Sequence, residues 1–216
     1  TLLASSAASD VYKRQLDGDL DNIKRLYDAG FRMMSLQHFF DNKLGGSLHG
    51  ESNAGLTEFG REAVRQMDSM GIMIDVSHSS PQVVDDVLNL IDSPLIVSHT
   101  GFKGHCDRKR NISDDLMLRF AERGGLIGVG FWSEAVCGTV VAAIADAIAY
   151  GVETFGVEAV ALGSDWDGAV TTPLAANDLA YLTSALLKRG LSENEIRAVM
   201  GGNTIQYFLE HLPATD

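Results

Sequence analysis

The chain has 216 residues, 45% of them hydrophobic, which is enough apolar material to bury the core of one globular domain. Its formal net charge of −12 excludes a general attraction for nucleic acids or anionic membranes. No apolar run approaches the roughly 20 residues that span a bilayer, so we expect no transmembrane segment.

The acidic composition is typical of a bacterial cytoplasmic protein, and we expect that location. Cys106 and Cys137 stand in neither a CxxC nor a zinc-ribbon spacing, so we expect two free, buried thiols. Residues 1–15 are rich in Ser and Ala and then read DVYKRQ, with no period that leads into the rest. We interpret them as a foreign or disordered leader, and residues 16–216 as a single domain.

From Leu16 onwards, helical and strand patterns alternate. Helices are expected at 17–29, 57–70, 81–91, 113–124 and 139–155, followed by helical stretches at 178–189, 192–200 and 203–211. Strands are expected at 31–36, 71–78, 94–99, 126–132 and 159–165. The strands are continuous apolar runs, which predicts a parallel sheet covered by helices on both faces. No GxGxxG opens a helix, which disfavours a Rossmann-type sheet and leaves a (β/α)8 TIM-barrel type of α/β fold.

Four of the five expected strands run into a polar residue: His38, His78, His99 and Asp165. In a parallel barrel the carboxyl ends of all strands lie on one rim, where active sites form. His78 and His99 end the near-identical runs IDVSH and LIVSH, the pattern expected of two ligands on adjacent strands for one metal ion. The alternative is a pair of structural histidines bonded to the loop backbone.

Asp165 and Arg110 are the other candidate site residues. Asp165 opens the loop in GSDWDG, and a carboxylate beside a cation can hold and move a proton during hydrolysis. Asp167 is expected to brace the turn through its own backbone. Arg110 follows the His99 loop and is suited to clamping a carboxylate in a bidentate manner, although a charged run such as DRKR is more often a solvated surface loop. His49, His105 and His211 receive no role.

The combination of several runs resembles the membrane dipeptidase (renal dipeptidase) family, peptidase family M19. The runs are GLTEFGREAVRQMDSMGIMIDVSH, PLIVSHTGFKGHCDRKRN, GGLIGVGFW, GSDWDG and GGN. The resemblance extends from about Leu16 to the C-terminus. It implies a metallodipeptidase with the metal-dependent hydrolase form of the TIM barrel, of which about the last five βα units are present. It also implies proteolysis of dipeptide substrates by a metal-bound hydroxide, two Zn²⁺ ions per intact site, and a homodimer.

The resemblance also implies a role for each matching residue. His78 and His99 would hold the second zinc ion. His38 would contact the substrate and take part in catalysis, Arg110 would bind the substrate carboxylate, and Asp165 would transfer a proton.

The chain departs from the family pattern at its N-terminal end. The family holds its first zinc ion with an HxD pair and bridges both ions with a Glu. No HxD precedes His38, and the place of the Glu, around Tyr12, reads Tyr-Lys-Arg. We therefore expect an N-terminally truncated fragment that lacks the ligands of the first zinc ion. The alternatives are a non-catalytic truncated product and another metal-dependent amidohydrolase of the same barrel class, acting on a cyclic amide or ester.

Overall fold

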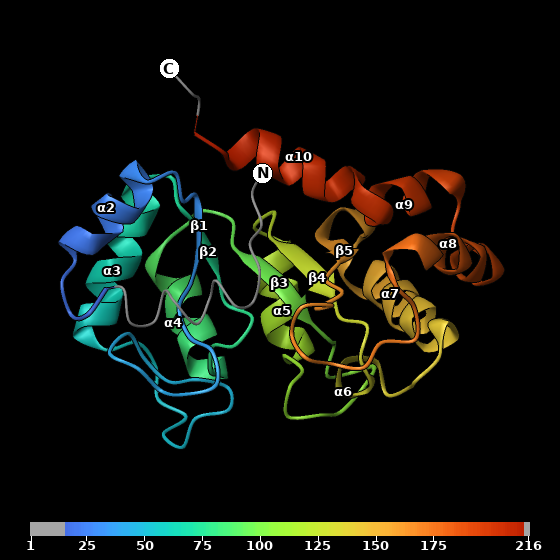
Figure 1. Cartoon of the computed structure of the whole chain (residues 1–216), viewed down its shortest axis with the longest axis horizontal. Helices are drawn as coiled ribbons and strands as arrows, with labels where there is room; N and C mark the ends of the chain where they lie inside the picture. Colours follow the sequence, from blue (N-terminus) through green and yellow to red (C-terminus); the bar gives the residue numbers. More distant parts are fainter. Residues whose placement is uncertain (1–15, 214–216) are drawn as a thin grey trace. The chain divides into compact units, whose positions relative to one another are not determined.

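The computed structural model describes residues 16–213, and the elements of this part of the chain are labelled in Figure 1. The leader expected at residues 1–15 lies outside the described residues. Five strands form one sheet in the order in which they occur along the chain. They are β1 (Met33–Ser35), β2 (Met73–Asp75), β3 (Ile96–Thr100), β4 (Leu126–Val129) and β5 (Val160–Leu162). β1 pairs parallel to β2, β2 to β3, and β4 to β5, which confirms the expected parallel sheet.

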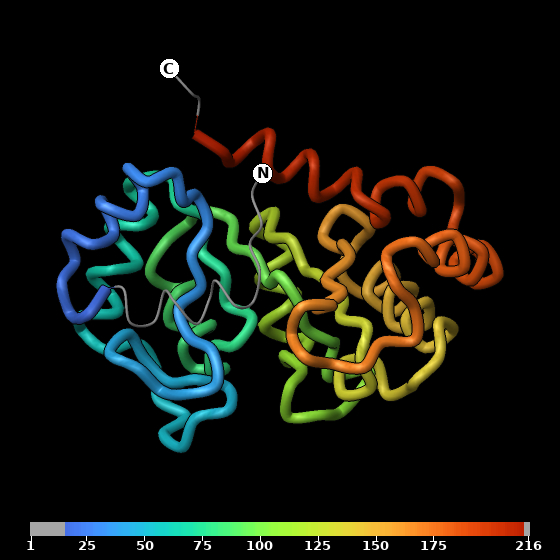
Figure 2. Tube along the Cα trace, viewed as in Figure 1, coloured from blue at the N-terminus to red at the C-terminus, as the bar shows by residue number. Residues whose placement is uncertain are grey.

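The chain forms two compact units. The first contains the residues up to Ile96 together with those from Leu209 onwards, and the second contains Val97–Phe208. The boundaries between the units fall inside β3 and inside the last helix. Figure 2 shows the path of the chain through each unit. No helix among the described residues is long and apolar enough to cross a membrane.

The first unit packs three helices beside β1 and β2: α2 (Asp21–Asp28), α3 (Glu58–Ser69) and α4 (Pro81–Leu90). Local chemistry fixes where two of them begin. The Thr57 hydroxyl accepts a hydrogen bond from the Gly60 N–H at the start of α3, and the Ser80 hydroxyl accepts one from the Val83 N–H ahead of α4. The buried positions of both helices recur at helical spacing, so each turns one apolar stripe inward.

The second unit contains the remaining helices. They are α5 (Asp114–Ala121), α6 (Ser133–Val136), α7 (Val141–Phe155), η1 (Val157–Ala159), η2 (Ala176–Asp178), α8 (Leu179–Lys188), α9 (Glu193–Arg197), the π-helical turn η3 (Ala198–Gly202) and α10 (Asn203–His211), whose last residues belong to the first unit. At Gly151 of α7, an added Cβ would lie 2.6 Å from the ring of Phe102, so the small residue permits close packing.

The five expected strands all exist, but they are three to five residues long because the chain leaves the sheet before the polar residue at most strand ends. The short helix α6 was not expected. The kink between α9 and α10 occurs at Gly201, whose φ of 152° only glycine adopts readily.

Candidate active site

The predicted site residues lie at the carboxyl ends of the strands, as expected. His38 follows β1, His78 follows β2, His99 lies in β3 and Asp165 follows β5. His38 and His78 belong to the first unit, whereas His99, Arg110 and Asp165 belong to the second. The sharing of one metal ion by His78 and His99 stays a prediction.

In the first unit, four rings form a cluster, which we call the histidine cluster: His38, Phe39, His49 and His78. The centroids of the His38 and His78 rings are 4.4 Å apart in an edge-to-face arrangement. The His49 ring lies 5.7 Å from that of His78 and 5.0 Å from that of Phe39. His38 and His78 are buried, and His49 is partly exposed.

The loop that carries His49 is folded onto the strand ends by its own polar groups. The Ser47 hydroxyl donates to the backbone carbonyl of His38, and the Leu48 N–H donates to that of His78 over 2.8 Å. Asp41 accepts the N–H of Ser47 over 2.7 Å, and this bond is the largest cause that lowers the pKa of the Asp41 carboxyl. Sequence reasoning missed His49 because this placement depends on contacts between the loop and two different strands.

Asp75 is the last residue of β2, three residues before His78, and it fixes the end of this strand. One of its oxygens accepts the N–H of Ser77 over 3.0 Å and the Ser77 hydroxyl over 2.5 Å. The other accepts the hydroxyl of Ser35, on the neighbouring strand, over 2.7 Å. A buried carboxylate bonded in this way orients the backbone that leads to His78. Sequence reasoning assigned Asp75 no role, although its place in IDVSH was a usable signal.

In the second unit, Arg110 is 7% exposed and lies against β3. Its Nη2 donates to the backbone carbonyl of His99 over 2.7 Å, and its Nη1 donates to the Thr100 hydroxyl over 3.3 Å. The guanidinium carbon lies 5.3 Å from the centroid of the Trp132 ring. The surface-loop alternative for Arg110 is therefore wrong, because the side chain is buried and bonded beside a predicted metal ligand.

His99 and Asp165 complete this group. Ser98 Oγ lies 2.9 Å from His99 Nδ1, and a partner on one ring nitrogen fixes the orientation of the ring. Asp165 adopts a left-handed backbone with φ of 57° at the start of the loop after β5. Burial raises the pKa of its carboxyl to about 6, against the lowering effect of the Arg110 guanidinium and with a smaller raising effect of Asp167. A carboxyl with this pKa can exchange a proton near neutral pH.

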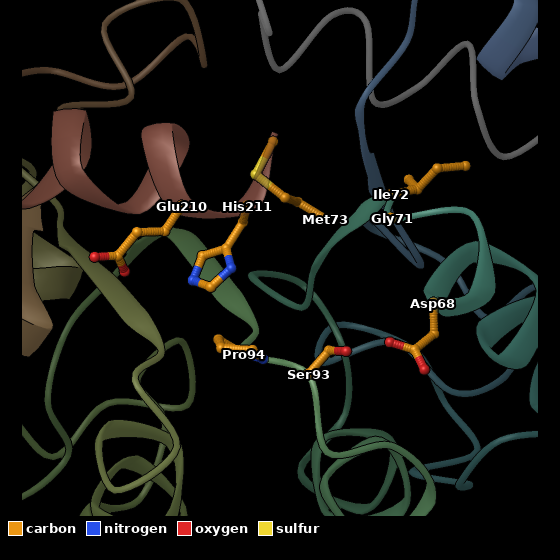
Figure 3. A pocket seen from close by; sticks show the side chains of 8 residues that line it. All are labelled: Asp68, Gly71, Ile72, Met73, Ser93, Pro94, Glu210 and His211. Carbon is orange, nitrogen blue, oxygen red and sulfur yellow. The ribbon is translucent and has the colours of Figure 1, made fainter. Parts of the chain in front are cut away.

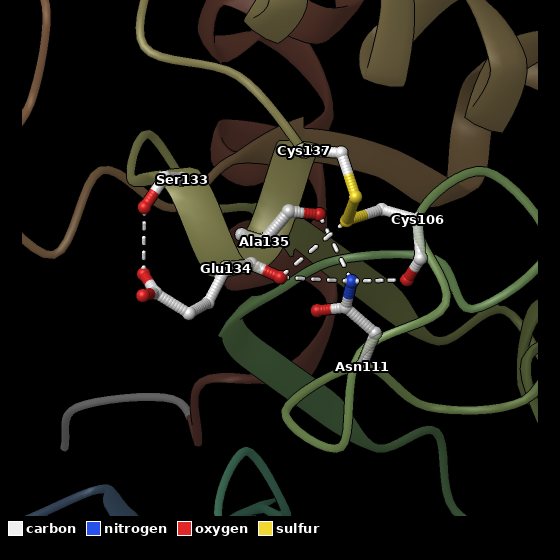
Figure 4. Close-up of a disulfide and its surroundings, with 6 residues drawn as sticks. All are labelled: Cys106, Asn111, Ser133, Glu134, Ala135 and Cys137. Carbon is white, nitrogen blue, oxygen red and sulfur yellow. Dashed lines mark hydrogen bonds between the residues drawn. A yellow bond between two sulfur atoms is a disulfide. The ribbon is translucent and has the colours of Figure 1, made fainter.

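The expectation of two free thiols is wrong, because Cys106 and Cys137 form a disulfide (Figure 4). They are 31 residues apart in sequence, but the loops after β3 and β4 bring their Cα atoms to 5.5 Å, within the range of a disulfide. The spacing of two cysteines in a sequence carries no information about such a meeting of loops.

His78 and His99 are the metal ligands that the sequence predicts. The imidazoles of His78 and His99 are the right kind of donor for zinc. Among residues 16–213, however, no group of three or more His, Cys, Asp or Glu side chains is placed to hold a metal ion. The one HxD triplet of the sequence, residues 105–107, lies in the loop after β3, with the His105 ring 5.5 Å from that of Tyr150 and its central cysteine in the disulfide. It is not at a strand end.

The first unit contains a cavity of about 190 Å³, and Figure 3 shows the side chains that line it. Its lining residues precede or begin β2, precede β3, or end α10: Asp68, Gly71, Ile72, Met73, Ser93, Pro94, Glu210 and His211. It is therefore at the amino end of β2, opposite the end at which His78 stands. Because active sites of parallel barrels form at the carboxyl ends, this cavity is not the candidate site.

The chain is similar in sequence to a known protein family and to a curated relative. The model of the membrane dipeptidase family, peptidase family M19, matches residues 12–211. An uncharacterized dipeptidase of Schizosaccharomyces pombe is 29% identical over 202 residues, which cover 89% of this chain and 49% of that protein. The chain thus spans about half the length of this curated relative.

Two crystal structures show the same fold. An amidohydrolase from Pseudomonas aeruginosa superposes with a TM-score of 0.80 at 25% identity, covering 88% of this chain and 68% of that one. A metallopeptidase from Rhodobacter sphaeroides, bound to a phosphinate mimic of the dipeptide L-Ala-D-Ala, gives a TM-score of 0.78 at 25% identity, covering 90% and 59%. The expected fold class, an α/β metal-dependent hydrolase of the barrel type with about five βα units, is confirmed.

Proposed function

The chain belongs to the membrane dipeptidase family, peptidase family M19, and we propose that it carries part of the active site of a zinc-dependent dipeptidase. The observation that carries the proposal is that one unit holds both a buried arginine, bonded to the His99 carbonyl, and a partly buried carboxyl whose pKa is about 6. Arginine supplies recognition of a substrate carboxylate, and the carboxyl supplies proton transfer. The substrate is a dipeptide with a free C-terminus.

Arg110 binds the terminal carboxylate of the substrate. Its guanidinium is held by the His99 carbonyl and the Thr100 hydroxyl, so little ordering remains to be done when a substrate arrives. A fixed cation at this position limits the substrate to peptides whose terminal carboxylate is close to the bond that is cut.

Asp165 takes the proton of the attacking water and passes it to the amine that leaves. A pKa of about 6 keeps the group mostly ionised at pH 7, and still lets it hold the proton between the two steps. His38 contacts the carbonyl oxygen of the substrate and stabilises the negative charge that develops there. The phosphinate ligand of the Rhodobacter sphaeroides metallopeptidase supports a dipeptide substrate, because phosphinates imitate the tetrahedral state of peptide hydrolysis.

His78 and His99 would each serve as metal ligands. Two bound zinc ions would supply Lewis-acid chemistry and lower the pKa of the attacking water. The other ligands that the family resemblance implies, an HxD pair at a first strand and a bridging Glu, would have to come from residues outside this sequence. Reading the DNA upstream of residue 1 tests that prediction.

The decisive assay measures hydrolysis of L-Ala-L-Ala, L-Ala-D-Ala and their C-terminal amides by protein expressed from its whole reading frame. The free dipeptides should be cut and the amides largely spared. Asp165→Asn should lower kcat by about 10²-fold or more at unchanged metal content. Arg110→Ala should raise KM for the free dipeptides and abolish the discrimination against amides, with Arg110→Lys as the charge-conserving control.

Equal cutting of free and amidated dipeptides by the unmutated protein would disprove the carboxylate clamp. It would favour the alternative of a broader metal-dependent amidohydrolase, which the similarity to the Pseudomonas aeruginosa amidohydrolase supports. Absence of any hydrolysis at full metal loading would favour a non-catalytic product.

We also propose a homodimer, by analogy with the family alone, and sedimentation of the purified protein tests it. The expected cytoplasmic location stays a prediction. The Cys106–Cys137 disulfide argues against the cytoplasm, because disulfides persist in oxidising compartments. Cell fractionation decides between the cytoplasm and an oxidising compartment.

A further inference from the structure

The loop that carries Arg110 is covalently tied to the segment after β4. Cys106 precedes Arg110 by four residues, and its disulfide partner Cys137 follows Trp132 by five. Trp132 is the ring against which the guanidinium of Arg110 lies, at 5.3 Å. The disulfide therefore joins the two segments between which the guanidinium is placed.

Asn111 forms a second tie between the same segments (Figure 4). Its side-chain amide donates to the carbonyl of Cys106 over 2.8 Å, and to the carbonyls of Glu134 and Ala135 over 3.2 and 3.0 Å. The side chain is buried, and an added Cβ at Gly101 would lie 2.5 Å from its Oδ1. This one side chain thus holds the turn over residues 102–106, which we call the Cys106 turn, against α6.

The Cys106 turn transmits this constraint to Arg110 through a short hydrogen-bonded backbone. The Cys106 N–H donates to the Phe102 carbonyl over 2.8 Å, the Arg108 N–H donates to the Cys106 carbonyl over 2.8 Å, and the Asn111 N–H donates to the Arg108 carbonyl over 3.1 Å. Each step spans two to four residues, so a displacement of Cys106 displaces the backbone on both sides of Arg110.

We propose that the Cys106–Cys137 disulfide and Asn111 are positioning elements for Arg110, and that reduction of the disulfide weakens capture of the substrate carboxylate. The inference deepens the proposed function and rests on it. In the reduction, a dithiol gives two electrons and two protons to the disulfide, which becomes two thiols while the dithiol becomes a disulfide. The step of hydrolysis itself does not use either cysteine. Reduction should therefore raise KM by about 5- to 50-fold, the effect of misplacing one charge-assisted hydrogen-bonding group, and leave kcat within about twofold.

The first arm of the test needs no activity. The sequence has two tryptophans, so Trp166→Phe leaves Trp132 as the single fluorescent reporter beside Arg110. Treatment of the whole chain with a dithiol should increase acrylamide quenching of Trp132 several-fold and accelerate amide exchange in residues 102–111. Exchange in α7 should stay unchanged. The double variant Cys106→Ala/Cys137→Ala is the matched control. Before any dithiol is added, its quenching and amide exchange should equal those of the reduced protein, and the dithiol should not change them.

The second arm measures kinetics of the metal-loaded protein expressed from its whole reading frame, oxidised and reduced, with free and amidated dipeptides. The KM for free dipeptides should rise on reduction while the slow cutting of amides stays the same, since amides have no carboxylate to bind. A general loss of structure would lower kcat for both substrates. If the reduced protein unfolds, Asn111→Ala with the disulfide intact replaces it, and should show the same split between KM and kcat.

Unchanged exchange and quenching around Arg110 on reduction would overturn the inference, whatever the activity. Unchanged KM in both the reduced protein and Asn111→Ala would also overturn it. If the oxidised protein cuts no dipeptide, the proposed function fails, and the first arm still decides whether the disulfide positions Arg110.

Discussion

Replacing Asp165 by asparagine removes a carboxyl whose ionisation the fold opposes. Burial raises the pKa of Asp165 from 3.8 to about 6, although Arg110 acts in the opposite direction. Asparagine has nearly the same shape and tolerates the left-handed backbone that Asp165 adopts, at φ of 57°. The substitution therefore removes the charge with little effect on the geometry of the turn.

The magnitude follows from the pKa difference between the folded and unfolded states. The pKa of Asp165 is about 6 in the folded state and 3.8 in the unfolded state. This difference means that the charged carboxylate destabilises the folded protein by at most about 3 kcal/mol. Asp165 is only partly buried, so solvent screening reduces this to about 1–2 kcal/mol. Because the folded-state pKa is the higher one, the penalty is absent below about pH 4, grows between pH 4 and 6, and is complete above pH 6.

We therefore expect Asp165→Asn to be more stable than the unmutated chain at pH 7 by about 1–2 kcal/mol, or about 2–8 °C in Tm. The two proteins should have equal stability at pH 4. Urea unfolding in the presence of a chelator, at pH 4, 5, 6 and 7, measures the difference without interference from bound metal. Asp167→Asn is the matched control and should change stability much less. If Asp165→Asn is less stable at pH 7, or if its advantage is the same at pH 4 and 7, the reasoning about burial is wrong.

Three further predictions follow from other parts of the chain. Asn203→Ala removes the amide that donates to the carbonyls of Val157 and Val160 over 2.6 and 2.8 Å, so it should cost about 1–3 kcal/mol in urea unfolding. The 216-residue chain should bind divalent metal weakly, because no three-ligand group exists among its described residues; two tightly held zinc ions in metal analysis would contradict this. The chain should also self-associate, because large apolar side chains such as Phe40 and Leu209 are 76% and 74% exposed. Sedimentation tests this, and a monodisperse, cooperatively melting monomer would disprove it.

The sequence alone determined the alternation of elements and the position of the candidate residues along them. Apolar runs such as 94–99 mark a strand that is buried on both faces, and this is a local property of the chain. Because parallel strands present their carboxyl ends at one edge, the polar residue that follows each run was identifiable without coordinates. His78, His99 and Asp165 were found in this way, and the family resemblance gave them roles.

The tertiary structure alone decided how these residues are supported. It placed His49 beside His78, brought Cys106 to Cys137, and buried Arg110 against Trp132. Each of these contacts joins two loops that are about 20 or more residues apart, and their meeting depends on the twist of the sheet and the length of each crossover. No pattern in a single stretch of sequence records such a contact, which is why the cysteines were expected to be free and the arginine was weighed against a surface position.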